Sequence, residues 1–117
     1  MDLSQATQAH SEWKVKLRMA ITKKESLDAN TISADNCCNL GKWLHGEAKG
    51  KYASLRSYSE CVQRHAAFHR EAGAVARVIN SGDFAKATQM LDGGTAYSAA
   101  SSSVGAAILG LKKEAAL

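Results

Sequence analysis

The sequence has 117 residues, a formal net charge of +4, three cysteines and no proline. This length suits one domain with a single core, which we place over residues 1–117, and it leaves no room for a second domain. The fifteen lysines and arginines are spread along the chain beside acidic neighbours, and the aromatic residues are two Trp, three Tyr and two Phe. A nucleic-acid-binding protein would show a basic stripe interleaved with aromatic residues, so we expect no nucleic-acid partner.

No apolar run approaches the roughly 18 residues of a membrane span, and Met1 is followed by a polar stretch rather than a signal peptide. We therefore expect a cytoplasmic protein and no membrane contact by this segment. An odd number of cysteines, with Cys37 and Cys38 adjacent, makes a poor disulfide framework and suits a reducing compartment. We therefore expect these thiols to serve in metal binding or redox chemistry instead of in structural disulfides.

The first predicted helix begins at Asp2 or Ser4 and ends near Lys23 and Lys24. Its inward stripe follows steps of three and four and consists of Ala6, His10, Trp13, Leu17, Ala20 and Ile21. This register turns His10 towards the core.

A short second helix is predicted from a Ser33 cap through Cys38 to about Leu44, with Asp35 in its first turn. The side chains that it presents to the interior are Leu40, Trp43 and Leu44. Gly41 lies three residues after Cys38, where a missing side chain lets another helix or the metal shell come close. Residues 46–51 are predicted to form an exposed loop.

The sequence Ser57-Tyr-Ser-Glu60 is a capping box, which predicts a third helix that runs to about Asn80. Its inward face is expected to hold Tyr58, Cys61, Val62, His65, Phe68, His69, Ala72, Val75, Ala76 and Ile79. A heptad register then follows at Met90, Gly94, Tyr97, Ser101, Val104, Ile108 and Leu111, and we interpret it as one long helix that continues across residues 92–94. The predicted fold class is all-α, an antiparallel four-helix bundle with a short extra helix that carries the metal-ligand cysteine. The heptad seam is a candidate homodimer surface.

His65 and His69 are four positions apart, so both imidazoles lie on one face of a helix within reach of one metal ion. A histidine on an apolar helix face is more often a hydrogen-bonded core residue than a ligand. His10 adds a third imidazole, however, and one zinc ion satisfies an acceptor nitrogen on each of the three rings.

All three cysteines are candidates for the fourth metal ligand. Cys61 precedes His65 by four residues on the same helix. The donors Cys61, His65 and His69 would then span about 12 Å along that helix, which is too far for them to bind one metal ion. Cys61 is better interpreted as a small buried hydrophobic residue. Cys37 and Cys38 point about 100° apart, so just one of them can face His65.

The run Cys38-Asn-Leu-Gly-Lys-Trp-Leu44, with His10 and Trp13 upstream and His65-x-x-Phe-His69 downstream, resembles the chemoreceptor zinc-binding (CZB) domain family over essentially the whole chain. The family pattern Cys-x-Leu-Gly-x-Trp-Leu selects Cys38 over Cys37. The resemblance implies Zn²⁺ as the cofactor. The ligands that it implies are His10, Cys38, His65 and His69, and Cys37 and Cys61 lie outside its pattern.

The resemblance also implies a function. Domains of this family are cytoplasmic, dimeric four-helix zinc sensors, found at the ends of bacterial chemoreceptors and beside diguanylate cyclase domains, and associated with responses to zinc and to oxidants such as hypochlorous acid. We therefore expect a regulatory module rather than an enzyme, with Cys38 as its redox switch and the signalling domain of a longer receptor or cyclase as its partner. One alternative is a purely structural zinc domain that mediates dimerisation. Another is a zinc hydrolase, which would need an open coordination position and a general base.

Three more residues are candidates for support around the metal. Trp43 and Phe68 are expected to form an apolar shell that keeps water away, with plain core packing as the alternative. Asp35 is a candidate acceptor for the ring N–H of a ligand histidine, although a charge in the first turn of a helix is the simpler interpretation. His45 lies outside the pattern and is expected to be exposed.

Overall fold

The computed structural model describes residues 1–117, and every regular element in it is an α-helix, which confirms the all-α class. In chain order the helices are α1 (Leu3–Ser11), α2 (Trp13–Lys23), α3 (Ala29–Ser33), α4 (Asn39–His45), α5 (Glu47–Tyr52), α6 (Arg56–Asn80), α7 (Phe84–Met90) and α8 (Ala96–Glu114). None of them combines the length and the apolar character that crossing a membrane requires.

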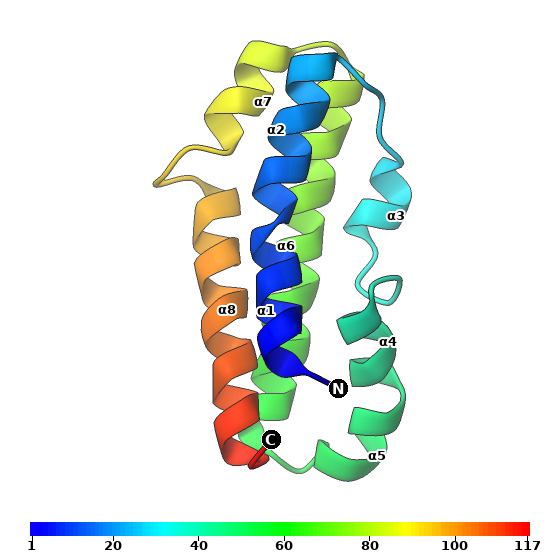
Figure 1. The fold of residues 1–117 in the computed structure, drawn as a ribbon, viewed down its shortest axis with the longest axis vertical. Coiled ribbons are helices and arrows are strands. Elements are labelled where there is room, and N and C mark those ends of the chain that lie inside the picture. The colour runs from blue at the N-terminus through cyan, green and yellow to red at the C-terminus, as the bar shows by residue number, and fades with distance from the viewer.

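The helices are arranged lengthwise around α6, which has 25 residues and is the longest (Figure 1). Helices α1 and α2 follow one another almost in line, and α8 runs beside them with α7 above it. The short helices α3, α4 and α5 succeed one another along the remaining side. Helix α6 contacts α2, α3, α4, α7 and α8, so most of the other helices pack against it.

The first predicted helix has the expected ends. The Asp2 side chain accepts hydrogen bonds from the backbone N–H groups of Ser4 and Gln5, which satisfies two free donors at the start of α1. Lys24 has a left-handed backbone, with φ of 54°, and it stops α2. A turn at Glu12 divides the predicted helix into α1 and α2.

The segment between Lys24 and Leu55 differs from the prediction. It holds three short helices where one helix and an exposed loop were expected. Asp28 caps α3 by accepting from the Thr31 N–H, and α4 begins six residues later than α3 ends, with Cys38 as its N-cap. Ser33 therefore ends a helix instead of starting one, and Asp35 lies in the connection before α4.

Helix α6 matches the third predicted helix closely, and the residues expected on its inward face are buried except for Val62, which is half-buried. The prediction of a capping box at the start of this helix is nevertheless wrong. The N–H and hydroxyl groups of Ser57 both donate to Oε1 of Glu114, at 3.1 and 2.6 Å, and α6 has no side-chain cap. Glu114 lies 57 residues downstream, so a tertiary hydrogen bond replaces the local one.

The prediction of a single long C-terminal helix is also wrong. Helix α7 ends at Met90, and α8 begins after Thr95, whose hydroxyl accepts from the Ser98 N–H. Gly94, with φ of +79°, takes a conformation that glycine adopts without strain. Four heptad residues are buried inside the chain, namely Tyr97, Val104, Ile108 and Leu111. They form the protein's own core instead of a free dimer seam.

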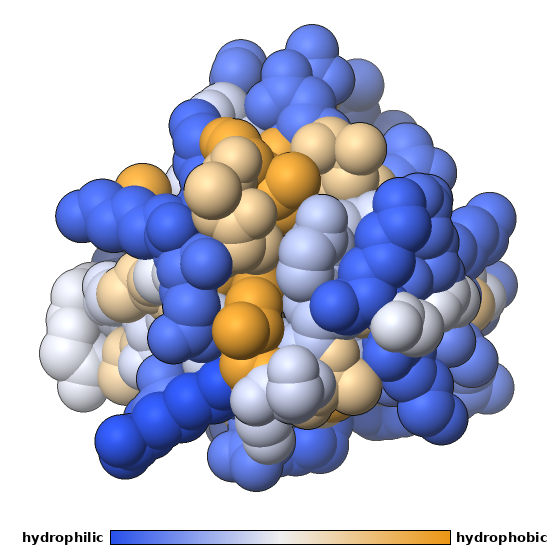
Figure 2. Space-filling model, turned by 90° about the horizontal axis from the view of Figure 1, so that it is seen from below, coloured by the Kyte–Doolittle hydropathy of each residue, from blue (hydrophilic) through white to orange (hydrophobic).

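Apolar residues reach the surface at the lower end of the molecule. Seen from this end, apolar atoms gather near the centre and hydrophilic side chains surround them (Figure 2). The chain ends lie towards the same end (Figure 1), and Met1 and Leu117 are 50 % and 45 % exposed. The lower end is thus one place where the fold leaves apolar surface uncovered.

Candidate metal centre

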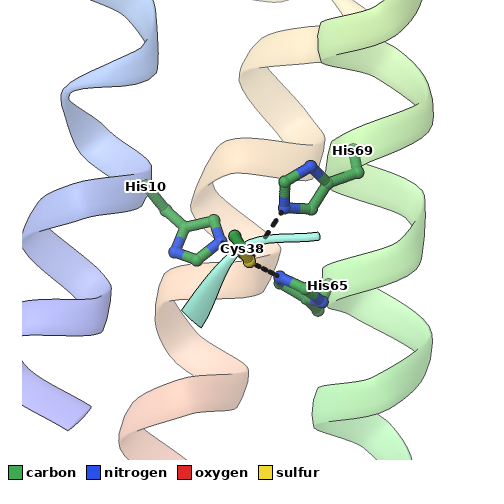
Figure 3. A group of neighbouring side chains, drawn as sticks. All are labelled: His10, Cys38, His65 and His69. Carbon is green, nitrogen blue, oxygen red and sulfur yellow. Dashed lines mark hydrogen bonds between the residues drawn. The ribbon is translucent and has the colours of Figure 1, made fainter. Parts of the chain in front are cut away.

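Four donor side chains from three segments meet beside the middle of α6 (Figure 3). His10 lies on α1, Cys38 at the N-cap of α4, and His65 and His69 on α6. Their donor atoms all lie within 4.8 Å of one another. The Nε2 atoms of His65, His69 and His10 lie 3.2, 3.6 and 3.9 Å from Sγ of Cys38. The structure therefore brings together all four residues named from the sequence.

This arrangement fits zinc. Zinc binds histidine nitrogen at about 2.0 to 2.1 Å and cysteine sulfur at about 2.3 Å, so tetrahedral coordination separates nitrogen and sulfur by roughly 3.5 Å. The three nitrogen–sulfur distances lie on both sides of that value. Three imidazoles with one thiolate are also a donor set that zinc accepts, and four donors complete a tetrahedral site.

Backbone carbonyl groups orient two of the imidazoles. Nδ1 of His10 donates to the carbonyl oxygen of Ala6 over 2.7 Å, and Nδ1 of His69 donates to that of Ile32 over 2.8 Å. Since a carbonyl oxygen can only accept, each Nδ1 carries the proton, and Nε2 of the neutral ring presents its lone pair to the site. This is the usual support for a metal-bound histidine. Nδ1 of His65 is buried without a partner.

Burial keeps the three histidines neutral at ordinary pH. Burial, together with the neighbouring His69 and His10, lowers the pKa of His65 to about 3. Burial also lowers the pKa of His10 and of His69, although their carbonyl hydrogen bonds oppose that effect. Neutral imidazoles are the form that binds a metal, so the site is ready for a cation without first losing protons from its rings.

Cys38 presents its sulfur from the start of α4. Burial raises the pKa of the Cys38 thiol, while the backbone N–H groups of Gly41 and Leu40 favour the thiolate. The Gly41 N–H lies 3.3 Å from Sγ and donates to it. A dication beside Sγ would favour the thiolate strongly, because a coordinated thiol loses its proton.

Two glycines permit the close packing that brings these segments together. A Cβ at Gly41 would overlap the carbonyl oxygen of Asp35, so the chain before Cys38 can fold back on α4 only where no side chain stands. A Cβ at Gly73 on α6 would overlap the side chain of Ser33 at the end of α3. A close approach at Gly41 is confirmed, but its partner is the connection at Asp35 instead of another helix or the metal shell.

The supporting residues divide into those near the site and those away from it. Phe68 is fully buried, and its ring packs edge-on against His10 and His69, with centroids 5.4 and 5.5 Å apart. The ring of Trp43 lies instead against Tyr52, at 6.0 Å between centroids. Phe68 is thus part of the apolar wall of the site, whereas the contact found for Trp43 belongs to α5.

The hydrogen-bond partner of Asp35 is His45 and not a ligand histidine. Its carboxylate accepts a hydrogen bond from Nε2 of His45 over 3.0 Å, and His45 is exposed as expected. This pair joins the connection before Cys38 to the end of α4. Cys37 is exposed and Cys61 is buried, and neither belongs to the donor cluster.

Sequence reasoning missed the carbonyl groups of Ala6 and Ile32 and the role of Gly73. A backbone carbonyl has no signature in the sequence, so the first two had no signal. Gly73 had one, because a glycine inside a strongly helical pattern often marks a close approach.

The chain matches the family model described as the chemoreceptor zinc-binding domain over residues 10–76, more than half of its length. The matched range begins at His10 and includes Cys38, His65 and His69. It is narrower than the whole-chain resemblance inferred from the motifs. The comparisons with curated proteins and with solved structures returned no match.

Proposed function

This chain belongs to the chemoreceptor zinc-binding domain family, and we propose that it is a regulatory module in which His10, Cys38, His65 and His69 hold one Zn²⁺. Loss of the metal or oxidation of Cys38 changes the packing of the helices, and a signalling partner reads that change. The observation that carries the proposal is the convergence of three Nε2 atoms on one sulfur, with all four donors within 4.8 Å.

Bound zinc would supply one chemical effect, which is to keep Cys38 as the thiolate. The thiolate is the nucleophilic form of cysteine, and it reacts with hypochlorous acid. The Cys38 sulfur gives up two electrons and gains the hydroxyl group as a sulfenic acid, while chlorine leaves as chloride. A sulfenic acid is a weaker donor to a metal than a thiolate, so the bond that holds the start of α4 against α6 is weakened.

The structure suggests how this change spreads. The Ile32 carbonyl accepts from His69, so α3 and the connection to Cys38 both depend on the same cluster. Further along, Asn80 forms two hydrogen bonds with the backbone of Leu27, at 2.7 and 2.8 Å. Near the end of α4, the Tyr58 hydroxyl donates to the Leu44 carbonyl over 2.6 Å. We propose that the segment between these two attachments is the part that responds.

We further propose a regulatory role instead of a catalytic one, because four protein donors fill a tetrahedral site and leave no open position for substrate. The proposed partners are a second copy of the chain and the signalling domain of a longer receptor or cyclase, in the cytoplasm. The expected four-helix antiparallel arrangement is part of this proposal, with α3, α4 and α5 forming its fourth side.

The alternative is a purely structural zinc domain that mediates dimerisation. It is favoured by the fully buried positions of His65 and His69, since a metal at the core of a small domain contributes directly to folding. Removal of the metal by a chelator, followed by circular dichroism and thermal unfolding, separates the two. A sensor keeps its helical content and recovers on addition of zinc, whereas a structural domain unfolds when the metal leaves.

A further inference from the structure

A cavity of about 320 Å³ opens beside Cys38, between α1, the start of α2 and the start of α4. His10 and Cys38 both line it, but His65 and His69 do not. The latter two are 0 % and 2 % exposed, so α6 shields its side of the centre. The volume far exceeds the roughly 10 to 15 Å³ that one water needs, so solvent can fill the cavity. The candidate metal centre is thus approached through the side that carries the cysteine.

The outer wall of this cavity has a simple origin in the sequence. Ala6, Ala9, Trp13 and Lys16 recur at steps of three and four, so they form one stripe along α1 and α2. The two alanines leave space open, because longer side chains on that stripe would project into it. The Lys16 ammonium lies 4.8 Å from the centroid of the Trp13 ring and helps to hold that edge.

The lining carries few charged groups. The Lys16 ammonium and the α-ammonium of Met1 are its cationic groups, and Asp2 supplies its one carboxylate. Two ammonium groups and one carboxylate do not discriminate among uncharged reagents, so for these the selectivity of the opening comes from size.

We infer that this cavity is the passage through which small reagents reach the Cys38 sulfur, with Ala9 keeping it open. The chemical class that it serves is small uncharged oxidants, such as hypochlorous acid, and electrophiles larger than the cavity itself are excluded. The oxidation is the one described above, in which the Cys38 sulfur is oxidised to the sulfenic acid and chlorine is reduced to chloride. The biological meaning of this passage rests on the proposed function, but the passage itself is a property of the fold.

The test measures how fast Cys38 is alkylated by iodoacetamide, followed by mass spectrometry. Cys37→Ser is the background for all proteins, because Cys37 is exposed and would add its own signal. Ala9→Phe and Gln5→Phe each place a ring in the cavity. Ala85→Phe is the matched control, since Ala85 is exposed on α7 and does not line the cavity.

We expect both cavity variants to slow the alkylation of Cys38 by about tenfold, since the rate of thiol reactions depends on access, and the control to leave it unchanged. Equal alkylation rates for the Cys37→Ser protein and for both cavity variants would overturn the inference. In the Cys37→Ser protein, whose cavity is unchanged, a polyethylene-glycol maleimide should react with Cys38 far more slowly than the small reagent N-ethylmaleimide. Equal rates for these two reagents would also overturn it, and this comparison needs no substitution near the site.

Each measurement is made with zinc-loaded and with metal-free protein, and the zinc content of each variant is determined. If the chain binds no zinc, the proposed function fails, while the dependence of alkylation on cavity size still decides the inference. If the protein binds zinc normally and the filled cavity leaves the alkylation rate unchanged, the inference fails and the proposed function stands.

Discussion

Nδ1 of His69 on α6 donates a hydrogen bond to the carbonyl oxygen of Ile32 on α3 over 2.8 Å, across 37 residues of sequence. This bond fixes the proton on Nδ1 and turns Nε2 towards Sγ of Cys38, 3.6 Å away. One side chain therefore joins the candidate metal centre to a helix that contributes no donor. In the proposed mechanism, a change at the centre would reach α3 through this bond.

Substitution of Gly41 by alanine should destabilise the protein by about 1 to 3 kcal/mol, because the added methyl group overlaps the Asp35 carbonyl oxygen. It should also weaken zinc binding, since relief of the overlap moves the segment that carries Cys38. Urea unfolding and zinc competition with a chelator measure the two effects.

Gly50→Ala is the matched control for Gly41→Ala. Gly50 lies in α5 with nothing near the position of a Cβ, so alanine should stabilise that helix by roughly 1 kcal/mol or less. Equal unfolding midpoints for the two variants would show that Gly41 is not needed for its close contact.

Cys38 and Cys61 should differ in their response to hypochlorous acid added below one equivalent. Cys61 is fully buried, and burial raises its pKa to about 12, so it remains an unreactive thiol. Cys38 should be oxidised as zinc is released, which a colorimetric chelator and mass spectrometry follow together. Zinc release with Cys38 unmodified, or oxidation of Cys61 before Cys38, would contradict a cysteine switch.

Several features of this centre could be predicted from the sequence and others could not. The histidine pair has a local signature, because residues four apart share a helix face, and His10 falls on the inward stripe of its own helix. The position of Cys38 as an N-cap was missed, since Ser33 offered the stronger local signal and Asp28 starts a separate helix, α3. The start of α6 was assigned to a capping box because Glu114, the true partner of Ser57, is distant in sequence.

The break between α7 and α8 illustrates the limit of periodicity. The heptad spacing continues across Gly93 and Gly94, so the pattern alone favours one helix. Glycine lowers helix propensity and adopts positive φ freely, and the Thr95 hydroxyl then caps a new helix. Here local conformational preference outweighed an unbroken hydrophobic pattern.

Raising the pH above about 9 should destabilise the protein. Burial raises the pKa of Cys61 from 9.0 to about 12 and that of Tyr97 from 10.0 to about 12, so the folded state disfavours both charged forms. Between about pH 9 and 12 the unfolded chain loses protons that the folded chain retains, and stability falls as pH rises. Urea unfolding at pH 8 and pH 10.5 checks this, and Cys61→Ala should reduce the slope.

The protein should be a dimer at micromolar concentration if α8 contributes an interface. The heptad residues are buried in the chain, but Leu109 on the outer face of α8 is 50 % exposed. Leu109→Glu should give a monomer in sedimentation, because a buried interfacial charge is costly. Val15→Glu on α2 is the control, at 59 % exposed. A wild-type monomer would remove the dimer from the proposal.

The most direct test of the central claim is the metal content of protein purified without added zinc, measured by mass spectrometry of the metal. The four-donor centre predicts about one zinc per chain. His65→Ala should lose the metal to a competing chelator, since it removes a buried donor, while His45→Ala should retain it because His45 is bonded to Asp35 outside the cluster. A wild-type protein without zinc, or full retention of zinc by His65→Ala, would contradict the assignment of the centre.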